Sequence, residues 1–418
     1  MSVSQHIVIL GGGVSGLSAA EACARNGHRV TLIERNGEQR SGCSFGNAGM
    51  VVPSHFVPMA APGVVMQGLK WMWNPESPFY IKPRVDLDLT RWGMWFIKSA
   101  TAAHVERCSP VLRDLHLASR HAYLELAAQG EDFGLVSKGL LMLCKENHTL
   151  EEEAAMAATA RALGVPAVVL DAAQVSQLDP GITMDVAGAI HYPRDCHLSP
   201  ERYLAVLQRR ATANSAKFLW GTQVHGFQRD QRRIRSVVTT EGEIEGDQFV
   251  LCGGIWSDRI IRSLGVRLPM QAGKGYSVSV PDPVQQPALC SILTEARVAV
   301  TPMGKALRFG GTMEMSGLNE DISQRRVDGI VAAATRYFPA FKRSHFDGID
   351  PWHGMRPCPP DGMPFLGRSA AADNLVIATG HAMMGLSLAP ITGIIVSRLV
   401  ANEDPGFNLQ LMRPDRFA

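Results

Sequence analysis

The segment His6-Ile7-Val8-Ile9-Leu10-Gly11-Gly12-Gly13-Val14-Ser15-Gly16 decides the fold of the N-terminal part of this chain. Its first five residues are typical of a buried strand, and its glycines match the pattern G-x-G-x-x-G. Residues 17–26 then predict a helix that Gly27 ends, and residues 29–33 predict a second strand. A strand, a glycine turn, a helix and a further strand together predict a Rossmann-like parallel sheet.

The glycine turn predicts a binding site for a dinucleotide. Gly11 allows the tight turn out of the strand, Gly13 lets the backbone approach a pyrophosphate, and Gly16 lets the helix pack on the strand. Val14 and Ser15 begin the helix, where free N–H groups and the positive end of the helix dipole attract phosphate.

Two further positions extend this predicted site. Glu34 ends the second strand, where a carboxylate binds two ribose hydroxyls and repels a 2′-phosphate, and Arg35 follows it. Residues 249–252 form another apolar strand that ends in Gly253-Gly254, a second place where backbone can meet the cofactor. These residues do not distinguish NAD from FAD.

Composition limits the class of protein. With 418 residues, 46% hydrophobic and 19% charged, the chain has the composition of a soluble globular protein of two domains. A net charge of +2 argues against nucleic-acid binding. The eight cysteines show no C-x-x-C and no metal-ligand spacing, so we expect reduced thiols, no metal site and a cytoplasmic location without a signal peptide.

Nucleotide-type elements occur at the start, in the middle and at the end of the chain. We therefore expect an α/β fold with a Rossmann-like cofactor domain built from discontinuous segments and an α+β substrate domain with a mixed sheet. The predicted cofactor domain comprises residues 1–85, 196–262 and 355–418, and the predicted substrate domain 86–195 and 263–354. The main predicted helices span residues 87–130, 151–163, 200–212, 323–338 and 380–401.

Several separated motifs occur beyond the glycine turn. They are Ser44-Phe45-Gly46-Asn47-Ala48-Gly49, Gly273-Lys274-Gly275-Tyr276-Ser277, Trp352-His353-Gly354-Met355-Arg356-Pro357 and Gly380-His381-Ala382-Met383-Met384-Gly385-Leu386. Together these motifs resemble the FAD-dependent D-amino-acid oxidoreductases, and the bacterial D-amino-acid dehydrogenases in particular. The resemblance spans nearly the whole chain, and it implies FAD as cofactor and a D-amino-acid-oxidase-like fold.

The resemblance also implies which segments contact the flavin. One is a loop of small residues that lies against the ring, and another is the start of the C-terminal helix, whose dipole faces the flavin N1/C2=O edge. A strand residue, Val224, corresponds to the position that contacts adenine. The loop residues are Ser44, Asn47, Ala48 and Gly49, and the helix residues are Gly380, His381, Met384, Gly385 and Leu386.

The substrate residues are likewise implied by the resemblance. Arg356 is expected to bind the substrate carboxylate through its guanidinium fork, although an arginine in isolation is more often part of a structural ion pair. Tyr276 is either a second carboxylate ligand or a core tyrosine, and His55 either touches substrate or is a bystander. Met383 stands where glycine oxidases carry an additional arginine, which argues for a substrate larger than glycine.

These observations predict oxidation of a D-amino acid by hydride transfer from Cα to flavin N5, giving an imino acid or a 2-oxo acid. Met383 and the bulky loop at 55–59 make a cyclic substrate such as cis-4-hydroxy-D-proline a candidate. One alternative is a glycine- or sarcosine-type oxidase that produces peroxide. Another is a flavin-binding redox sensor or subunit without catalytic activity.

The expected partners are the amino acid and an electron acceptor, for which the resemblance favours a quinone over oxygen. Oligomerisation is left open. An apolar, aromatic-rich set of residues either packs in the core or forms a face that contacts the inner side of the membrane peripherally. This set comprises Met66, Trp71, Met72, Trp73, Trp92, Trp95 and Phe96.

Overall fold

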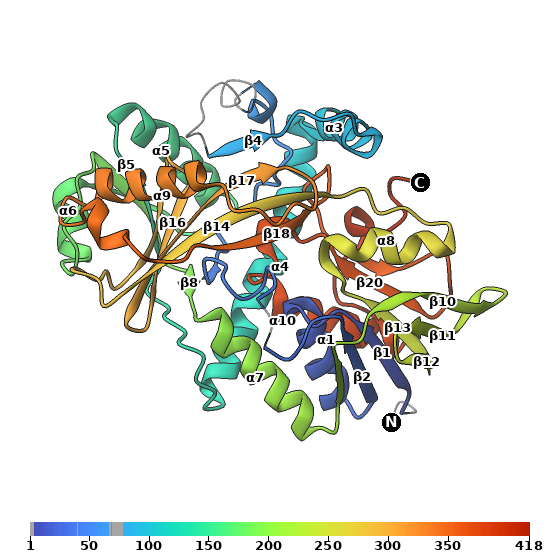
Figure 1. Cartoon of the computed structure of the whole chain (residues 1–418). Helices are drawn as coiled ribbons and strands as arrows, with labels where there is room; N and C mark the ends of the chain where they lie inside the picture. The colour runs from blue at the N-terminus through green and yellow to red at the C-terminus, as the bar shows by residue number, and fades with distance from the viewer. Residues whose placement is uncertain (1–3, 40, 67, 69–77) are drawn as a thin grey trace.

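The computed structural model describes residues 4–39, 41–66, 68 and 78–418, and its two large sheets lie side by side (Figure 1). The first sheet is parallel except for its antiparallel edge strand β19. Its order is β19 (Phe365–Arg368), β20 (Leu375–Thr379), β13 (Gln248–Leu251), β1 (His6–Leu10), β2 (Arg29–Glu34) and β9 (Lys217–Trp220). Strands from the start, middle and end of the chain therefore meet in one sheet, as predicted.

Strand β1 lies in the middle of this sheet and is buried on both faces. Ile7 and Ile9 pack against the helices on one face, while Val8 and Leu10 pack under a small antiparallel sheet on the other. The alternation explains why the strand is a continuous apolar run. The helices are α1 (Val14–Arg25), α7 (Pro200–Ala213) and α10 (Ala389–Val400), and the small sheet is β10 (Val224–Asp230), β11 (Arg233–Thr239) and β12 (Gly242–Glu245).

The second sheet is mixed and has α9 (Gln324–Tyr337) on one face, where an apolar core separate from that of the first sheet forms. Its main path is β18 (Trp352–Cys358), β14 (Gln271–Pro281), β17 (Ala306–Met315), β16 (Val298–Met303), β15 (Cys290–Leu293), β5 (Leu140–Cys144), β7 (Gly188–Tyr192) and β6 (Val168–Asp171), and β4 (Phe79–Ile81) pairs with β17. A short ladder of β3 (Met50–Val51) and β8 (Cys196–His197) connects the regions of the two sheets. The remaining helices are α3 (Leu87–Ser99), α4 (Ala102–Ala128), α5 (Asn147–Ala162), α6 (Ala172–Leu178) and α8 (Ser257–Ile261), with 3₁₀ turns at η1 (Gly254–Trp256), η2 (Arg262–Leu264), η3 (Arg343–Phe346), η4 (Ala382–Met384) and η5 (Gln410–Met412).

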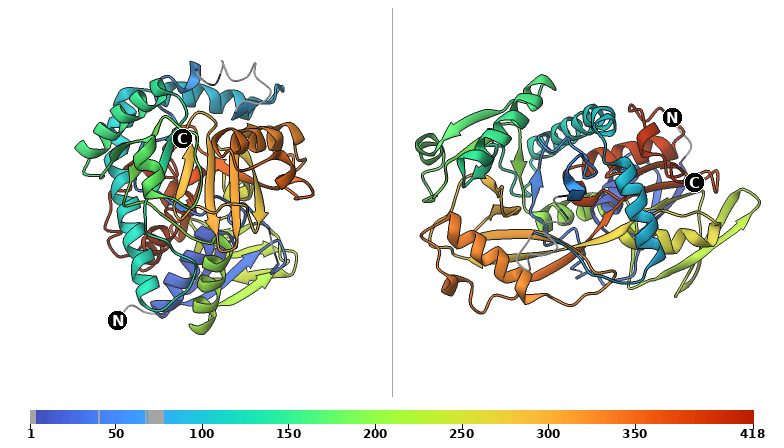
Figure 2. Two further views of the ribbon diagram at one scale, coloured as in Figure 1. Left: turned by 90° about the vertical axis from the view of Figure 1, so that its left-hand side faces the viewer. Right: turned by 90° about the horizontal axis from the view of Figure 1, so that it is seen from above.

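The long helix predicted over residues 87–130 is two helices. α3 ends at Ser99, and Thr101 begins α4 by accepting a hydrogen bond from the His104 N–H through its side chain. α4 then packs against α10 and runs alongside the first sheet, as the views in Figures 1 and 2 show. A segment assigned from sequence to the substrate domain therefore also contacts the cofactor domain.

Two predicted boundaries need correction. The boundary between residues 354 and 355 cuts through β18, which pairs continuously with β14 from Trp352 to Cys358. Similarly, β4 belongs to the second sheet although it precedes the predicted boundary at residue 85. In both cases the domain boundary is set by pairing between strands that are far apart in the chain. Such pairing has no local signal in the sequence.

The helix predicted from Gly380 begins later. Residues after Gly380 form the 3₁₀ turn η4 and a further turn, and α10 starts only at Ala389. Gly380 has φ +74° and Ala382 has φ +47°, both outside the helical region. The segment that was predicted as the first turn of a helix is a separate turn in front of it.

α1 and α10 pack so closely that a side chain at one glycine of α10 has no room. A Cβ at Gly393 would lie 2.4 Å from the Ser18 carbonyl oxygen. We expect Gly393→Ala to lower the free energy of unfolding by about 1–3 kcal/mol because backbone must move. At Gly93 in α3 a Cβ would meet no atom within 4 Å, so Gly93→Ala should be neutral or stabilise by up to about 1 kcal/mol. Thermal unfolding of both variants tests this, and equal Tm values would contradict it.

Candidate functional site

A cavity lies at the carboxyl ends of the parallel strands β1, β2 and β13 and reaches across to β18. Ligands of open α/β sheets bind at this edge. Most of the predicted cofactor residues line the cavity: Gly11, Gly13, Val14, Ser15, Glu34, Arg35, Ser44, Asn47, Val224, Gly253, Gly380, His381, Gly385 and Leu386. Gly16, Ala48, Gly49 and Met384 do not line it.

Two glycines of the turn leave no space for a side chain. Gly11 has φ +114°, and a Cβ there would lie 2.5 Å from the Cys252 carbonyl oxygen. A Cβ at Gly16 would lie 1.8 Å from the Gly11 carbonyl oxygen, so Gly16 packs the helix on the strand instead of lining the cavity. The result is an open cradle of backbone at Gly13, in front of the first N–H groups of α1.

Glu34 is held at the end of β2 by backbone N–H groups. Gly12 N–H donates to Oε2 over 2.7 Å, and Asn36 N–H donates to Oε1 over 2.9 Å. These bonds aim the carboxylate along the cavity wall. Beside it, the guanidinium of Arg35 stacks on the indole of Trp256 with 3.7 Å between Cζ and the ring centroid.

The loop after β2 folds back onto the start of α1. Val14 N–H donates to Ser44 Oγ over 2.9 Å, so Ser44 caps a helix whose own N-cap residue is glycine. Asn47 holds the loop by donating to the Ser44 carbonyl and accepting from the Gly49 N–H. The Ser44 and Asn47 side chains thus bond within the protein and also line the cavity.

Ala48 and Gly49 were predicted to contact the cofactor, and the structure corrects this. The Ala48 carbonyl accepts from Thr301 Oγ1 over 2.7 Å, and a Cβ at Gly49 would lie 2.3 Å from the Leu198 carbonyl oxygen. Both residues therefore contact other parts of the chain and not the cavity. Gly49 has φ +67°, which explains the need for glycine.

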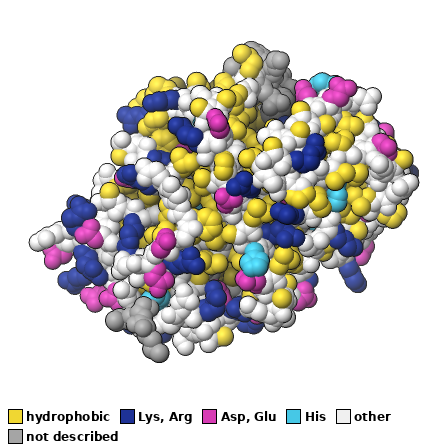
Figure 3. Space-filling view, turned by 180° about the vertical axis from the view of Figure 1, so that it is seen from behind, with side chains coloured by type: hydrophobic (Ala, Val, Ile, Leu, Met, Phe, Trp, Pro, Cys, Tyr) yellow, Lys and Arg dark blue, Asp and Glu magenta, His cyan; other side chains and the backbone are white. Residues whose placement is uncertain are grey.

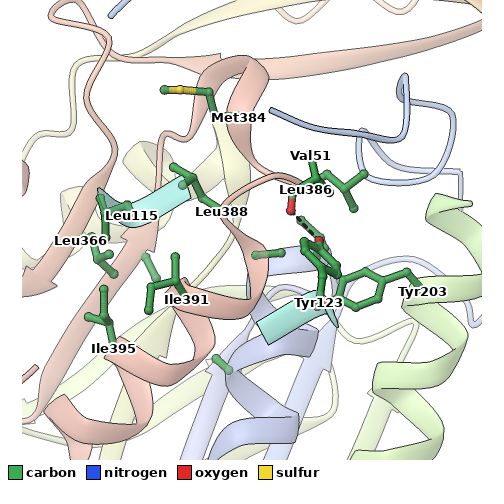
Figure 4. Packing of buried hydrophobic residues seen from close by; sticks show 14 of the residues in the cluster. Val51, Leu115, Tyr123, Tyr203, Leu366, Met384, Leu386, Leu388, Ile391 and Ile395 are labelled. Carbon is green, nitrogen blue, oxygen red and sulfur yellow. Dashed lines mark hydrogen bonds between the residues drawn. The ribbon is translucent and has the colours of Figure 1, made fainter. Parts of the chain in front are cut away.

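The turn from Gly380 to Leu386 forms the wall opposite the glycine cradle, except for Met384. The Met384 side chain belongs to the core cluster drawn in Figure 4 and does not line the cavity. The neighbouring Met383 lines the cavity instead. His381 is buried, and its Nε2 lies 3.0 Å from Thr392 Oγ1. Burial lowers the pKa of His381 to about 4, so the ring is neutral at neutral pH and supports the turn.

Arg356 lies on β18 at the other wall of the cavity. Its guanidinium lies against Gly275 of β14, where a Cβ would come within 2.1 Å of Nη1, and Nη1 donates to the Thr312 carbonyl over 3.0 Å. Across the described residues, no acidic side chain lies within ion-pair distance of Arg356. Arg356 thus differs from the usual arginine, whose charge takes part in a structural ion pair.

Tyr276 is not a carboxylate ligand. Neighbouring residues of a strand face opposite sides, so Tyr276 points away from the side on which Gly275 meets Arg356. Its side chain is buried in the core under α9, and its hydroxyl donates to Glu314 Oε2 over 2.9 Å. The structure thus agrees with the alternative prediction, that Tyr276 is a core tyrosine. Burial beside the Glu314 carboxylate raises the pKa of its hydroxyl.

His55 does not line the cavity either. Its Nδ1 lies 3.0 Å from Ser54 Oγ, which donates to the buried carboxylate of Asp195 over 2.5 Å. Burial lowers the pKa of His55 to about 4. The ring is thus a neutral part of a partly buried polar cluster away from the cavity, and this position lends no support to the prediction that it contacts substrate.

Sequence reasoning missed several lining residues. Trp256 follows the glycine pair 253–254 closely, and its position there was a usable signal. Gly275 supports the Arg356 guanidinium without lining the cavity, and the period of a strand puts it on the face opposite to Tyr276. Further lining residues include Gly12, Asn36, Thr222, Gln223, His225, Ile255, Arg259, Met355, Pro357 and Ala382.

The aromatic residues considered for a membrane face pack against other side chains where they are described, and Trp95 and Phe96 remain partly exposed. Trp92 is buried and donates to the Cys358 carbonyl, Phe96 stacks on it, and Trp95 packs against Phe417. Trp71, Met72 and Trp73 lie outside the described residues, while Met66 is exposed. Among the described helices, none has the length and apolar character needed to cross a bilayer. Acidic and basic side chains alternate over the rear face, in keeping with the small net charge (Figure 3).

Comparisons with known proteins identify the family and the fold of this chain. The profile of the family described as FAD dependent oxidoreductase matches residues 6–399. This chain belongs to that family. It is 30% identical to the D-amino acid dehydrogenase of Rhizorhabdus wittichii over 98% of this chain and 100% of that protein, and 29% identical to the D-amino acid dehydrogenase of Bradyrhizobium diazoefficiens over 99% of both. The glycine oxidase structure from Geobacillus kaustophilus has a TM-score of 0.80 and 24% identity, and 99% of each chain is covered.

FAD is therefore the cofactor, and the predicted D-amino-acid-oxidase-like fold is confirmed. The cavity fits this molecule, because the backbone at Gly13 and the start of α1 line it and leave room for phosphates, while Glu34 offers carboxylate oxygens for ribose hydroxyls. Val224 lines one end, and the loop at Ser44 and the turn after Gly380 line the end that reaches Arg356. Val224 would hold the adenosine part of FAD and the backbone at Gly13 the pyrophosphate. The loop at Ser44 and the turn after Gly380 would hold the flavin.

Glu34 provides a test of this arrangement. In Glu34→Gln one acceptor oxygen and the negative charge are lost, so we expect the affinity for FAD to fall about tenfold. Fluorescence titration of the apoprotein with FAD measures the change. Glu241→Gln, an exposed change in the turn between β11 and β12, is the control and should bind FAD as before. An unchanged Kd in Glu34→Gln would contradict the assignment.

Proposed function

We propose that this protein is an FAD-dependent D-amino acid dehydrogenase that oxidises its substrate to an imino acid. Water converts an acyclic imino acid to a 2-oxo acid and ammonia, whereas the product of a cyclic substrate remains a cyclic imine and releases no ammonia. The observation that carries the proposal is Arg356. It is a guanidinium at the wall of the flavin cavity with no acidic partner among the described residues, which suits a carboxylate ligand. Full-length relatives named D-amino acid dehydrogenase, at 28–30% identity, support the same substrate class.

In this proposal the chain contributes binding and orientation. Arg356 binds the carboxylate in two parallel hydrogen bonds, because the contact with Thr312 restrains one side of the fork and Gly275 supports its face. Bound FAD supplies a two-electron acceptor for the hydrogen on the substrate Cα. The amine gives up its proton to solvent before oxidation, so turnover should rise with pH. Most of the rate then comes from positioning.

For the substrate we propose an amino acid with a larger or cyclic side chain, such as cis-4-hydroxy-D-proline. Met383 supports this choice, because its side chain lines the cavity and is 60% exposed there, offering an apolar surface and no charge. The loop at 55–59 lends no support, since it does not line the cavity. As electron acceptor we propose a quinone or another carrier and not oxygen, on the basis of the dehydrogenase relatives.

Arg356 and Gly275 test the carboxylate site. Arg356→Ala should raise KM for the D-amino acid about 100-fold, because a charge-assisted bidentate contact is lost. Gly275→Ala should raise KM less, because its new methyl group pushes the guanidinium aside without removing the charge. Steady-state kinetics measures both, with the exposed Arg325→Ala in α9 as the control. Unchanged KM in Arg356→Ala, with FAD still bound, would contradict the proposal.

Anaerobic bleaching tests the substrate class. We expect the flavin absorbance to bleach with D-amino acids and not with their L-enantiomers, and faster with cis-4-hydroxy-D-proline than with D-alanine. Exclusive bleaching by D-alanine would reject the cyclic substrate while keeping the enzyme class. Bleaching by glycine with rapid peroxide release in air would favour an oxidase. No bleaching by any amine would favour a redox sensor.

A further inference from the structure

α4 carries buried polar residues that contact one wall of the flavin cavity on the side that faces away from the cavity. His116 and Tyr123 lie seven residues apart, on one face of the helix, and both are fully buried. Neither lines the cavity. Both bind the turn that follows Gly380, which does line it, and the catalytic scheme above uses neither residue.

The contacts of His116 determine which nitrogen carries the proton. Nε2 lies 3.4 Å from Met384 Sδ, and Nδ1 lies 2.8 Å from Ser387 Oγ. A thioether sulfur only accepts hydrogen bonds, so Nε2 must carry the hydrogen that points to it. Burial lowers the pKa of His116 to about 3, so the ring is neutral and Nδ1 is an acceptor.

The same reasoning gives the direction of the next two bonds. Since Nδ1 carries no hydrogen, the Ser387 hydroxyl donates to it, and Ser387 Oγ in turn accepts from the Val52 N–H over 2.9 Å. The sequence of donors runs from Val52 through Ser387 and His116 to Met384. Val52 directly follows β3, which itself follows the loop that contains Ser44 and Asn47. This relay of hydrogen bonds therefore connects that loop to the turn after Gly380, and both segments line the flavin cavity.

Tyr123 adds a second attachment. Its hydroxyl donates to the Leu386 carbonyl over 2.6 Å, drawn as the dashed line in Figure 4. Tyr203 of α7 packs against Tyr123 with 4.8 Å between ring centroids. α4 therefore holds the turn at Met384, at Leu386 and at Ser387, three points within four residues. The turn contains a strained residue, Ala382 with φ +47°, which persists only where its surroundings hold it.

We propose that His116 is a positioning residue for the flavin: through Ser387 and Met384 it fixes the turn at Gly380–Leu386 in the conformation that receives the cofactor. The backbone N–H groups of a turn stabilise developing negative charge only when they are preorganised. A fixed turn thus favours the reduced cofactor, which carries more electron density than the oxidised one. The proposal depends on FAD binding and not on the substrate class.

The test compares His116→Leu with His104→Leu. His104 is a second buried histidine of α4, and its Nε2 bonds to the Asp361 carbonyl, which does not line the cavity. In His116→Leu we expect about tenfold weaker FAD binding, and a midpoint potential lower by about 30 mV, the equivalent of a tenfold change for two electrons. In His104→Leu we expect a lower Tm alone. His116→Gln should restore the potential, because its amide offers both an acceptor and a donor.

The outcomes are separate from those for the proposed function, because the potential is measured with a chemical reductant and needs no amino acid. If His116→Leu lowers Tm while leaving the potential and the FAD affinity unchanged, its role is merely structural and the proposal is wrong. If that variant does not fold, Ser387→Ala removes one hydroxyl from the same relay. It should shift the potential in the same direction, and an unchanged potential would overturn the proposal.

Discussion

The contact between the Gly16 position and the Gly11 carbonyl underlies the rest of this structure. With no Cβ at residue 16, α1 comes against the end of β1 at a distance that no other residue permits. This approach brings the first N–H groups of α1 to the edge of the sheet where phosphates bind. It also sets the position of α1 against α10, whose Gly393 fits against the Ser18 carbonyl. A backbone-only contact thus determines both the cofactor cradle and the packing of the helices that cover the sheet.

The cavity is assembled from segments that are far apart in the chain. Each is held by hydrogen bonds between segments, as where Ser44 caps α1 and Glu34 accepts from the glycine turn. The turn after Gly380 depends on α4 in the same way, through Ser387 and Leu386. Since α4 also leads into the second sheet, the geometry of the flavin wall is linked to the domain that provides Arg356.

The substrate side shows how strand geometry distributes roles between neighbours. Gly275 and Tyr276 are adjacent, yet one forms the surface on which Arg356 lies and the other is buried under α9. The sequence singled out Tyr276 of this motif, whereas in the structure Gly275 is the residue that contacts Arg356. A similar exchange occurs at the turn, where Met383 lines the cavity and Met384 anchors the turn in the core. The identity of a motif is local information, whereas the side that each residue faces depends on what packs against it.

The sequence alone determined the Rossmann-like unit, the glycine turn with Glu34 at the edge of the sheet, and the discontinuous first sheet. These follow from local rules, namely apolar periodicity, the freedom of glycine and the chemistry of a carboxylate. Only the tertiary structure decided that Arg356 has no acidic partner among the described residues, that His55 belongs to a partly buried polar cluster, and that α4 holds the turn after Gly380. Burial and pairing of this kind arise between residues tens to hundreds of positions apart, and no local pattern encodes which of them will meet.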